Sequence, residues 1–91
     1  MKVELTTSFK FDFKYWSKHN KKTVRRILLL ISSIKEEPFA GIGKPEKLKY
    51  ELSGCWSRRI NKEHRIVYRV KNKTIQLLSC RYHYTKSIHI C

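Results

Sequence analysis

Acidic residues are scarce in this sequence. Of its 91 residues, 7 are Asp or Glu and 21 are Lys or Arg, which gives a formal net charge of +14 at pH 7. So few carboxylates argue against a two-metal nuclease site. The four histidines, His19, His64, His83 and His89, lack ligand spacing, and the three cysteines form no C-x-x-C pair. The sequence therefore predicts chemistry that uses neither a metal nor a cofactor.

Long apolar runs are also missing. The longest aliphatic run, Ile27 to Ile31, is too short to cross a bilayer, and the opening MKVELTTSFKFDFKYW lacks the apolar core of a signal peptide. We therefore expect a cytoplasmic protein without a membrane anchor. Hydrophobic residues make up 41% of the chain, which is typical of folded proteins, and the length suffices for one core. We expect a single domain over residues 1–91.

The excess of positive charge predicts a polyanionic partner. Self-repulsion of this size opposes a compact state, and a bound polyanion relieves it. Nucleic acid is the first candidate, because phosphates release counterions when Lys and Arg neutralise them. An acidic protein partner would serve the same purpose, and a basic protein with neither partner is the simplest alternative.

Two helical patterns open the chain. Phe9, Phe13 and Trp16 recur at i, i+4 and i+7 after possible N-cap residues at 6–8, which predicts a helix from about Ser8 to Lys18. The aromatic residues of the same stretch also alternate, as they would in a strand. A second helix follows the possible cap Asn20 and ends before Pro38. Its apolar stripe consists of Val24, Ile27, Leu28, Ile31 and Ile34.

The second half of the chain predicts strands. β-Branched and aromatic residues alternate with polar ones at 55–60, 65–71 and 74–84, and the expected turns fall at 61–64 and near Asn72. The expected fold is α+β, with two N-terminal helices packed on a mostly antiparallel twisted sheet. Arg65 and Arg69 then share one sheet face, whereas Arg58 and Arg59 diverge. Such strand arginines suit a cradle for a phosphate backbone.

RNA cleavage without a metal requires three groups. A base activates the 2′-hydroxyl, cations stabilise the developing phosphorane, and an acid protonates the 5′-oxygen. His83 is a candidate acid, strand arginines are candidate cations, and Glu46, Glu51 or Glu63 is a candidate base. A lone strand histidine is more often structural than catalytic, so these residues alone leave the question open.

The stretch "PFAGIGKPEKLKYELSGCWSRRINKEHRIVYRV", followed by "CRYHY", resembles the YoeB-type toxins of type II toxin–antitoxin modules, within the RelE superfamily. The resemblance runs from about Tyr15 to Tyr84. It implies a microbial-ribonuclease-like fold and an endoribonuclease that cleaves messenger RNA at the A site of the 70S ribosome. It further implies ends carrying a 2′,3′-cyclic phosphate and a 5′-hydroxyl, inhibition by a cognate antitoxin, and a homodimer.

The resemblance also assigns roles to matching residues. Glu46 would be the general base, Arg65 would contact the scissile phosphate, and His83 would be the general acid beside Tyr84. The matching RNA-binding residues are Lys49 and Arg59. Residues 85–91, TKSIHIC, extend past the point where such toxins commonly end. The alternative is a noncatalytic basic module of the same ancestry that binds RNA, ribosomes or DNA.

Overall fold

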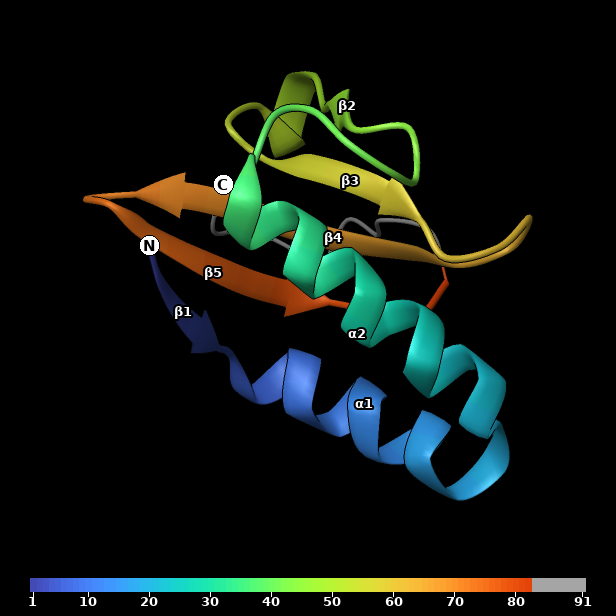
Figure 1. Ribbon diagram of the computed structural model, residues 1–91. Helices are drawn as coiled ribbons and strands as arrows, with labels where there is room; N and C mark the ends of the chain where they lie inside the picture. Colours follow the sequence, from blue (N-terminus) through green and yellow to red (C-terminus); the bar gives the residue numbers. More distant parts are fainter. Residues whose placement is uncertain (83–91) are drawn as a thin grey trace.

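A five-stranded sheet and two helices build the protein, whose computed structural model describes residues 1–82. The elements are β1 (Lys2–Leu5), α1 (Thr7–His19), α2 (Lys21–Glu36), β2 (Glu46–Lys47), the 3-10 helix η1 (Tyr50–Leu52), β3 (Trp56–Arg59), β4 (Arg65–Lys71) and β5 (Thr74–Ser79). The strand order is β1-β5-β4-β3-β2, and only the β1–β5 pair is parallel. Both helices cover the same face of the sheet (Figure 1). The predicted α+β fold is confirmed.

Both helices begin at residues whose side chains cap them. The Thr6 hydroxyl accepts a hydrogen bond from the Phe9 amide at 3.2 Å, and the Asn20 side chain accepts one from the Thr23 amide at 3.1 Å. The helix predicted from Ser8 to Lys18 is thus confirmed and extends one residue further at each end. The strand alternative for this stretch is wrong, because its buried residues follow the helical period.

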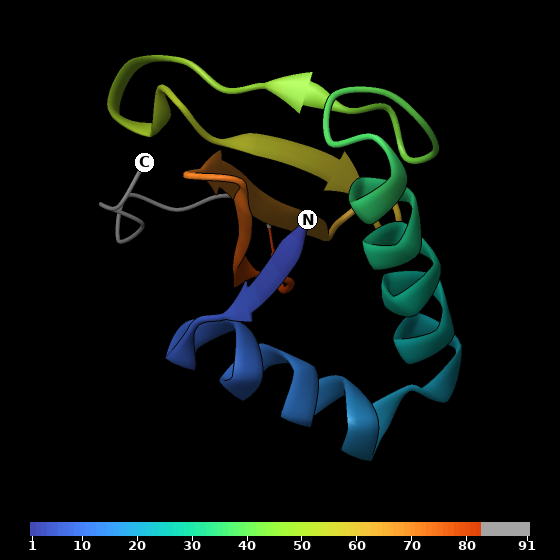
Figure 2. The ribbon, with the colours of Figure 1, turned by 60° about the vertical axis from the view of Figure 1, so that its left-hand side comes forward.

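The main core lies between the helices and the sheet. Figure 2 shows α1 and α2 meeting at an angle, with the sheet packed against the inner side of that angle. The fully buried aliphatic residues of this core are Ile27, Leu30, Ile34, Ile66, Ile75 and Leu77. Each such side chain contributes about 1.5–3 kcal/mol relative to an exposed one. No helix of residues 1–82 is long and apolar enough to cross a membrane.

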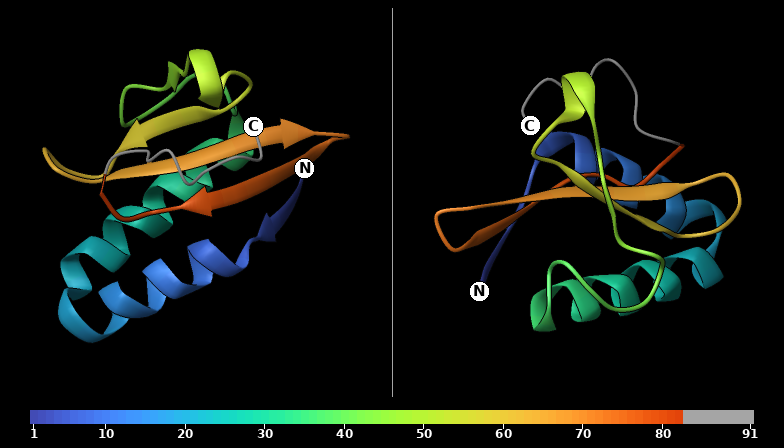
Figure 3. Two further views of the ribbon diagram at one scale, coloured as in Figure 1. Left: turned by 180° about the vertical axis from the view of Figure 1, so that it is seen from behind. Right: turned by 90° about the horizontal axis from the view of Figure 1, so that it is seen from above.

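A smaller apolar cluster covers part of the other sheet face. It consists of Leu48, Leu52, Cys55, Val67 and Leu78. The first three come from the segment around η1, which folds over the end of the sheet away from α1 (Figure 3). The remainder of that face carries polar and charged side chains, so the sheet has one apolar face and one mixed face.

The sequence did not predict the two edge strands. β1 is four residues long and pairs with β5, more than 70 positions later in the chain. Thr6 reinforces this pairing, because its hydroxyl donates to the Leu77 carbonyl at 2.9 Å. β2 has only two residues and lies in the Gly/Pro-rich loop. Neither segment is long enough to show a strand period.

The predicted hairpins are largely confirmed. The strand predicted at 65–71 is β4, and Asn72 and Lys73, both with positive φ, form the tight turn to β5. The last strand was predicted to reach residue 84, and that prediction is wrong, because β5 ends at Ser79. Tyr82 has a φ of 61°, which is incompatible with a continuing strand.

Candidate active site

Three of the predicted site residues share the mixed face of the sheet. Glu46 in β2 lies opposite Ser57 in β3, and Arg59, two residues further along β3, lies opposite Arg65 in β4. Directly opposite residues of an antiparallel pair point to the same face, with Cβ atoms about 4.5–5.5 Å apart. The fold therefore brings Glu46, Arg59 and Arg65 together on the side away from the helices.

Arg65 is held by the turn that precedes it. Its Nη1 atom donates to the carbonyls of Asn61 at 2.7 Å, His64 at 3.1 Å and Lys62 at 3.4 Å. The Asn61 side chain in turn accepts hydrogen bonds from the amides of Glu63 and His64, which closes the turn. Within residues 1–82, no carboxylate forms an ion pair with Arg65. Within the part of the chain that the structure describes, the guanidinium is thus oriented without an ion-pair partner.

Side chains of α1 hold the start of the segment 80–82. The Cys80 amide donates to the Asp12 carboxylate at 3.0 Å, and the Trp16 indole donates to the Cys80 carbonyl at 2.8 Å. Burial raises the pKa of Asp12, and the Cys80 hydrogen bond and the charge of Arg81 oppose that rise. Both backbone groups of Cys80 are therefore satisfied by a helix far away in sequence.

The end of the same segment is fixed to the beginning of β4. The Tyr82 amide donates to Nδ1 of His64 at 2.6 Å, and the Arg65 amide donates to the Tyr82 carbonyl at 2.9 Å. The His64 ring also contacts Trp16, with 4.7 Å between ring centroids. These contacts place Tyr82 directly beside the backbone of Arg65. The sequence pattern did not mark His64, Trp16 or Asp12 as positioning residues.

The other predicted site residues differ in how they are placed. His83 and Tyr84 lie outside the described residues, although His83 directly follows Tyr82 in the sequence. Lys49 is exposed just before η1, and Arg59 is exposed at the end of β3. Their ammonium and guanidinium groups therefore lie at the surface of the molecule.

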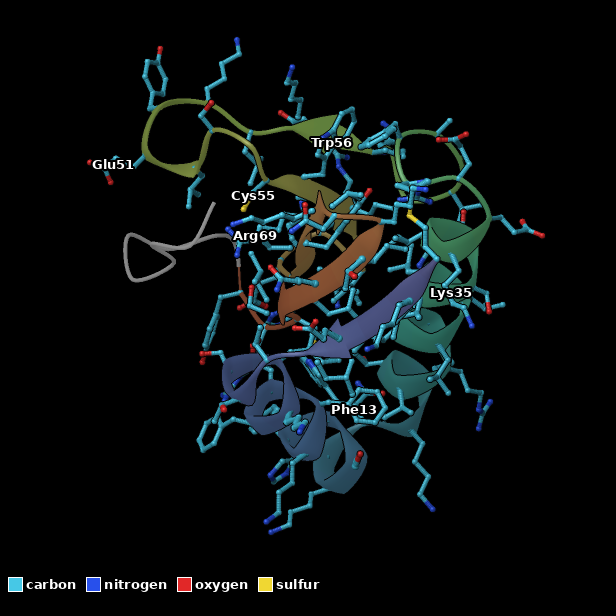
Figure 4. All side chains as sticks on the ribbon, turned by 90° about the vertical axis from the view of Figure 1, so that its left-hand side faces the viewer. Phe13, Lys35, Glu51, Cys55, Trp56 and Arg69 are labelled. Carbon is cyan, nitrogen blue, oxygen red and sulfur yellow. The ribbon has the colours of Figure 1, made fainter. Side chains whose placement is uncertain are left out.

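The three candidate bases are also distinguished by position. Glu46 is paired into the sheet, whereas Glu51 projects from η1 away from the sheet (Figure 4). Glu63 lies in the turn before β4, and its carboxylate is 3.7 Å from Nε2 of His64. Of the three, only Glu46 shares the sheet face of Arg59 and Arg65 by strand register.

Arg58 is structural, which corrects the suggestion that it belongs to a phosphate cradle. Its side chain is completely buried on the helix side of the sheet. Its guanidinium donates to Tyr68 Oη, Ser33 Oγ and the carbonyls of Glu37, Ala40 and Ile42. These bonds fasten the loop after α2 onto the sheet. Gly41 is required there, because an added Cβ would lie 2.9 Å from the Arg58 guanidinium.

The described residues offer neither a metal site nor an activated thiol. No group of three His, Cys, Asp or Glu side chains in residues 1–82 is arranged to hold a metal ion. Burial raises the pKa of the Cys80 thiol far above its usual range, with a smaller contribution from the charge of Asp12. A protonated, buried thiol is a poor nucleophile. Cys80 is therefore not a candidate nucleophile.

Known proteins are similar to this chain in both sequence and fold. Toxin YoeB of Synechocystis is 48% identical over 86 residues, which cover 94% of this chain and 100% of the relative. The YoeB/ParE toxin from Agrobacterium tumefaciens superposes with a TM-score of 0.89 at 44% identity, over 92% of this chain and 100% of that one. The YoeB dimer and the heterotetrameric YoeB-YefM toxin-antitoxin complex from Staphylococcus aureus give 0.84 and 0.83, each at 45% identity over 92% of this chain and 98% of theirs.

These similarities show that the protein is a small toxin of a toxin–antitoxin module. The family model described as "YoeB-like toxin of bacterial type II toxin-antitoxin system" matches residues 5–84. The chain belongs to this YoeB-like family. The predicted resemblance is confirmed.

Proposed function

We propose that the protein is a metal-independent endoribonuclease that cleaves messenger RNA at the A site of the 70S ribosome and so stops translation. The proposed setting is the cytoplasm, where ribosomes work. The main support is that Glu46, Arg59 and Arg65 lie on one face of the sheet. Beside them, the Arg65 amide donates a hydrogen bond to the Tyr82 carbonyl. Membership of a toxin family whose members are known as ribonucleases supports the proposal.

In the proposed reaction, the Glu46 carboxylate accepts the proton of a ribose 2′-hydroxyl. The 2′-oxygen then forms a bond to the adjacent phosphorus, and the bond from phosphorus to the 5′-oxygen breaks. His83 donates a proton to the departing 5′-oxygen. The products are a 2′,3′-cyclic phosphate and a 5′-hydroxyl, so no water molecule is consumed in the cleavage step. Tyr84 would orient the phosphate or stack on a base.

Arg65 would stabilise the phosphorane, with Lys49 and Arg59 binding the flanking phosphates. The turn carbonyls already hold the Arg65 guanidinium, so little reorganisation is needed when charge develops on the phosphoryl oxygens. Arg59 and Arg65 lie directly opposite each other, an unfavourable arrangement for like charges. A bound phosphate between them would turn that repulsion into attraction.

We further propose a homodimer and an inhibitory antitoxin with an acidic toxin-binding segment. A groove of about 480 Å³ runs between α1, α2 and β1, and Figure 4 shows Phe13 at the junction of the two helices. Leu5, Phe9 and Leu28 give it an apolar floor, and Lys10 and Lys14 line it as well. This combination suits an amphipathic acidic segment better than a second copy of a chain with a charge of +14.

The test is in vitro translation of a defined message with the wild-type protein, with Glu46→Gln and with His83→Ala. New RNA ends are mapped by primer extension with and without ribosomes. We expect ribosome-dependent cuts that both variants lose. Translation arrest with an intact message would instead identify a noncatalytic binding module.

A further inference from the structure

A second basic hollow lies on α1, beside the segment 80–82. It measures about 330 Å³ and is lined by Phe11, Lys14, Tyr15, Lys18, His19 and Arg81. We propose that this hollow binds one unpaired nucleotide of a single RNA strand, with the base on Phe11 and the flanking phosphates on the cations. The inference rests on the proposed function in taking RNA as the ligand, and it adds a subsite outside the predicted catalytic residues.

Phe11 is the candidate stacking surface. Its side chain is 71% exposed, on the side of α1 opposite to the buried Phe9 and Trp16. The neighbouring Tyr15 ring is already covered, because Arg81 lies over it at 3.4 Å and the His19 ring lies 4.4 Å away. An exposed phenyl ring contributes no burial of apolar surface to the core. Stacking on an unpaired base would remove the ring from water.

Arg81 is a cation held in a fixed position. Its guanidinium lies between the rings of Tyr15 and Tyr82, at 3.4 Å and 4.8 Å from their centroids, and donates to the Tyr82 hydroxyl at 3.0 Å. Asp12 is the only acidic residue of α1, and its carboxylate accepts a hydrogen bond from the Cys80 amide. Within residues 1–82 no ion pair joins it to Arg81. Asp12 therefore offsets only part of the positive charge at this hollow.

Lys14 and Lys18 add two more charges on one side of α1. Residues four positions apart are neighbours on a helix surface, and like charges at this spacing destabilise a helix slightly. A phosphate bound between them would remove that repulsion. The first turn of α1 contains no acidic residue. Asp12 is therefore the only negatively charged residue of this helix that could offset the charges of the two lysines.

The hollow and the candidate active site are adjacent. Trp16 follows Tyr15 in α1, and its ring contacts both Tyr15, at 5.1 Å, and His64, at 4.7 Å between centroids. Arg81 lies in the hollow, while the next residue, Tyr82, is bonded to Arg65 and His64. A strand that crosses Arg65 can therefore continue over Arg81 towards Phe11.

The test measures binding of a fluorescent RNA dodecamer with 2′-O-methyl groups, which this chemistry cannot cleave. The variants are Phe11→Ala, Phe11→Trp and the double variant Lys14→Ala/Lys18→Ala. The matched control is Lys71→Ala/Lys73→Ala, an exposed lysine pair at the β4–β5 turn. All these side chains are exposed, and circular dichroism melts check that each variant folds.

We expect Phe11→Ala to weaken binding about fivefold to a hundredfold and Phe11→Trp to restore it. The Lys14/Lys18 variant should reduce the slope of log affinity against log salt by about 0.7 per lost phosphate contact. An RNA with one abasic position should bind the wild type and Phe11→Ala alike. Equal losses in the control pair, or no loss in the variants, overturn the inference. Because the probe cannot be cut, failure of the ribonuclease proposal leaves this measurement intact.

Discussion

The backbone amide of Tyr82 donates a 2.6 Å hydrogen bond to Nδ1 of His64. An imidazole nitrogen accepts a hydrogen bond only when it carries no proton, so this contact fixes the tautomer of His64. The ring is buried against Trp16 and lies next to Arg65 in the sequence. It thus couples the predicted phosphate-binding arginine to the backbone that leads into His83.

His64→Leu should reduce the cleavage rate about tenfold to a hundredfold. The Tyr82 amide loses its hydrogen-bond acceptor, so the backbone leading into His83 shifts, and a small misplacement of catalytic groups lowers the rate by such factors. His64→Asn keeps an acceptor near Nδ1 and should restore most of the rate. The measurement is the single-turnover rate on programmed ribosomes, with substrate affinity determined separately. A rate loss in both variants that tracks their melting temperatures would reduce His64 to a purely structural residue.

Arg65→Ala should lower the cleavage rate on the order of a hundredfold or more, as expected when a preorganised charge donor is removed. The matched control is Arg69→Ala, four residues further along β4 on the same face, where the side chain is bonded to Gln76 instead. We expect near-normal cleavage in the control. Primer-extension yields over time measure both, and equal effects would point to general charge loss.

Arg58→Met should destabilise the protein by about 3–5 kcal/mol, because it removes a buried charged group and leaves its acceptors unpaired. Arg59→Met changes the adjacent, exposed arginine and should alter the free energy of unfolding by no more than about 0.5 kcal/mol. Urea unfolding followed by fluorescence provides the comparison. Similar values for the two variants would contradict the structural role of Arg58.

Leu28→Glu should weaken binding of an acidic antitoxin at least tenfold, since it places a carboxylate in the apolar groove between α1 and α2. Leu29→Glu is the control: that leucine is also exposed but does not line the groove. Titration calorimetry with the cognate antitoxin measures the difference. If both variants bind like the wild type, the antitoxin uses another surface.

The sequence predicted the elements whose patterns are local. The periods of both helices and of β4 are evident in their own residues, and Thr6 and Asn20 cap the helices as the sequence allowed. β1 was missed because its four residues become a strand only through pairing with β5. The end of β5 was placed too late, since the contacts of Cys80 and Tyr82 with α1 and His64 replace a strand ladder.

The candidate site was predicted in part. Alternation along the strands separated Arg58 from Arg59 and put Arg65 with Arg69, as the register shows. Alternation did not reveal that Arg58 is buried, because a fully buried arginine is rare and depends on acceptors from a distant loop. The assignments of Glu46 and His83 came from family resemblance and stay predictions.

The parallel pairing of β1 with β5 has a consequence for synthesis of the protein. The strand β1 acquires its partner only after residues 74–79 have left the ribosome, because β5 is the last strand of residues 1–82. The segment 80–82 docks on α1 and β4 later still. Such long-range closure is slow compared with local helix formation. A nascent chain therefore cannot assemble this site until residues 74–82 have emerged, and a ribonuclease of the proposed kind would stay inactive until then.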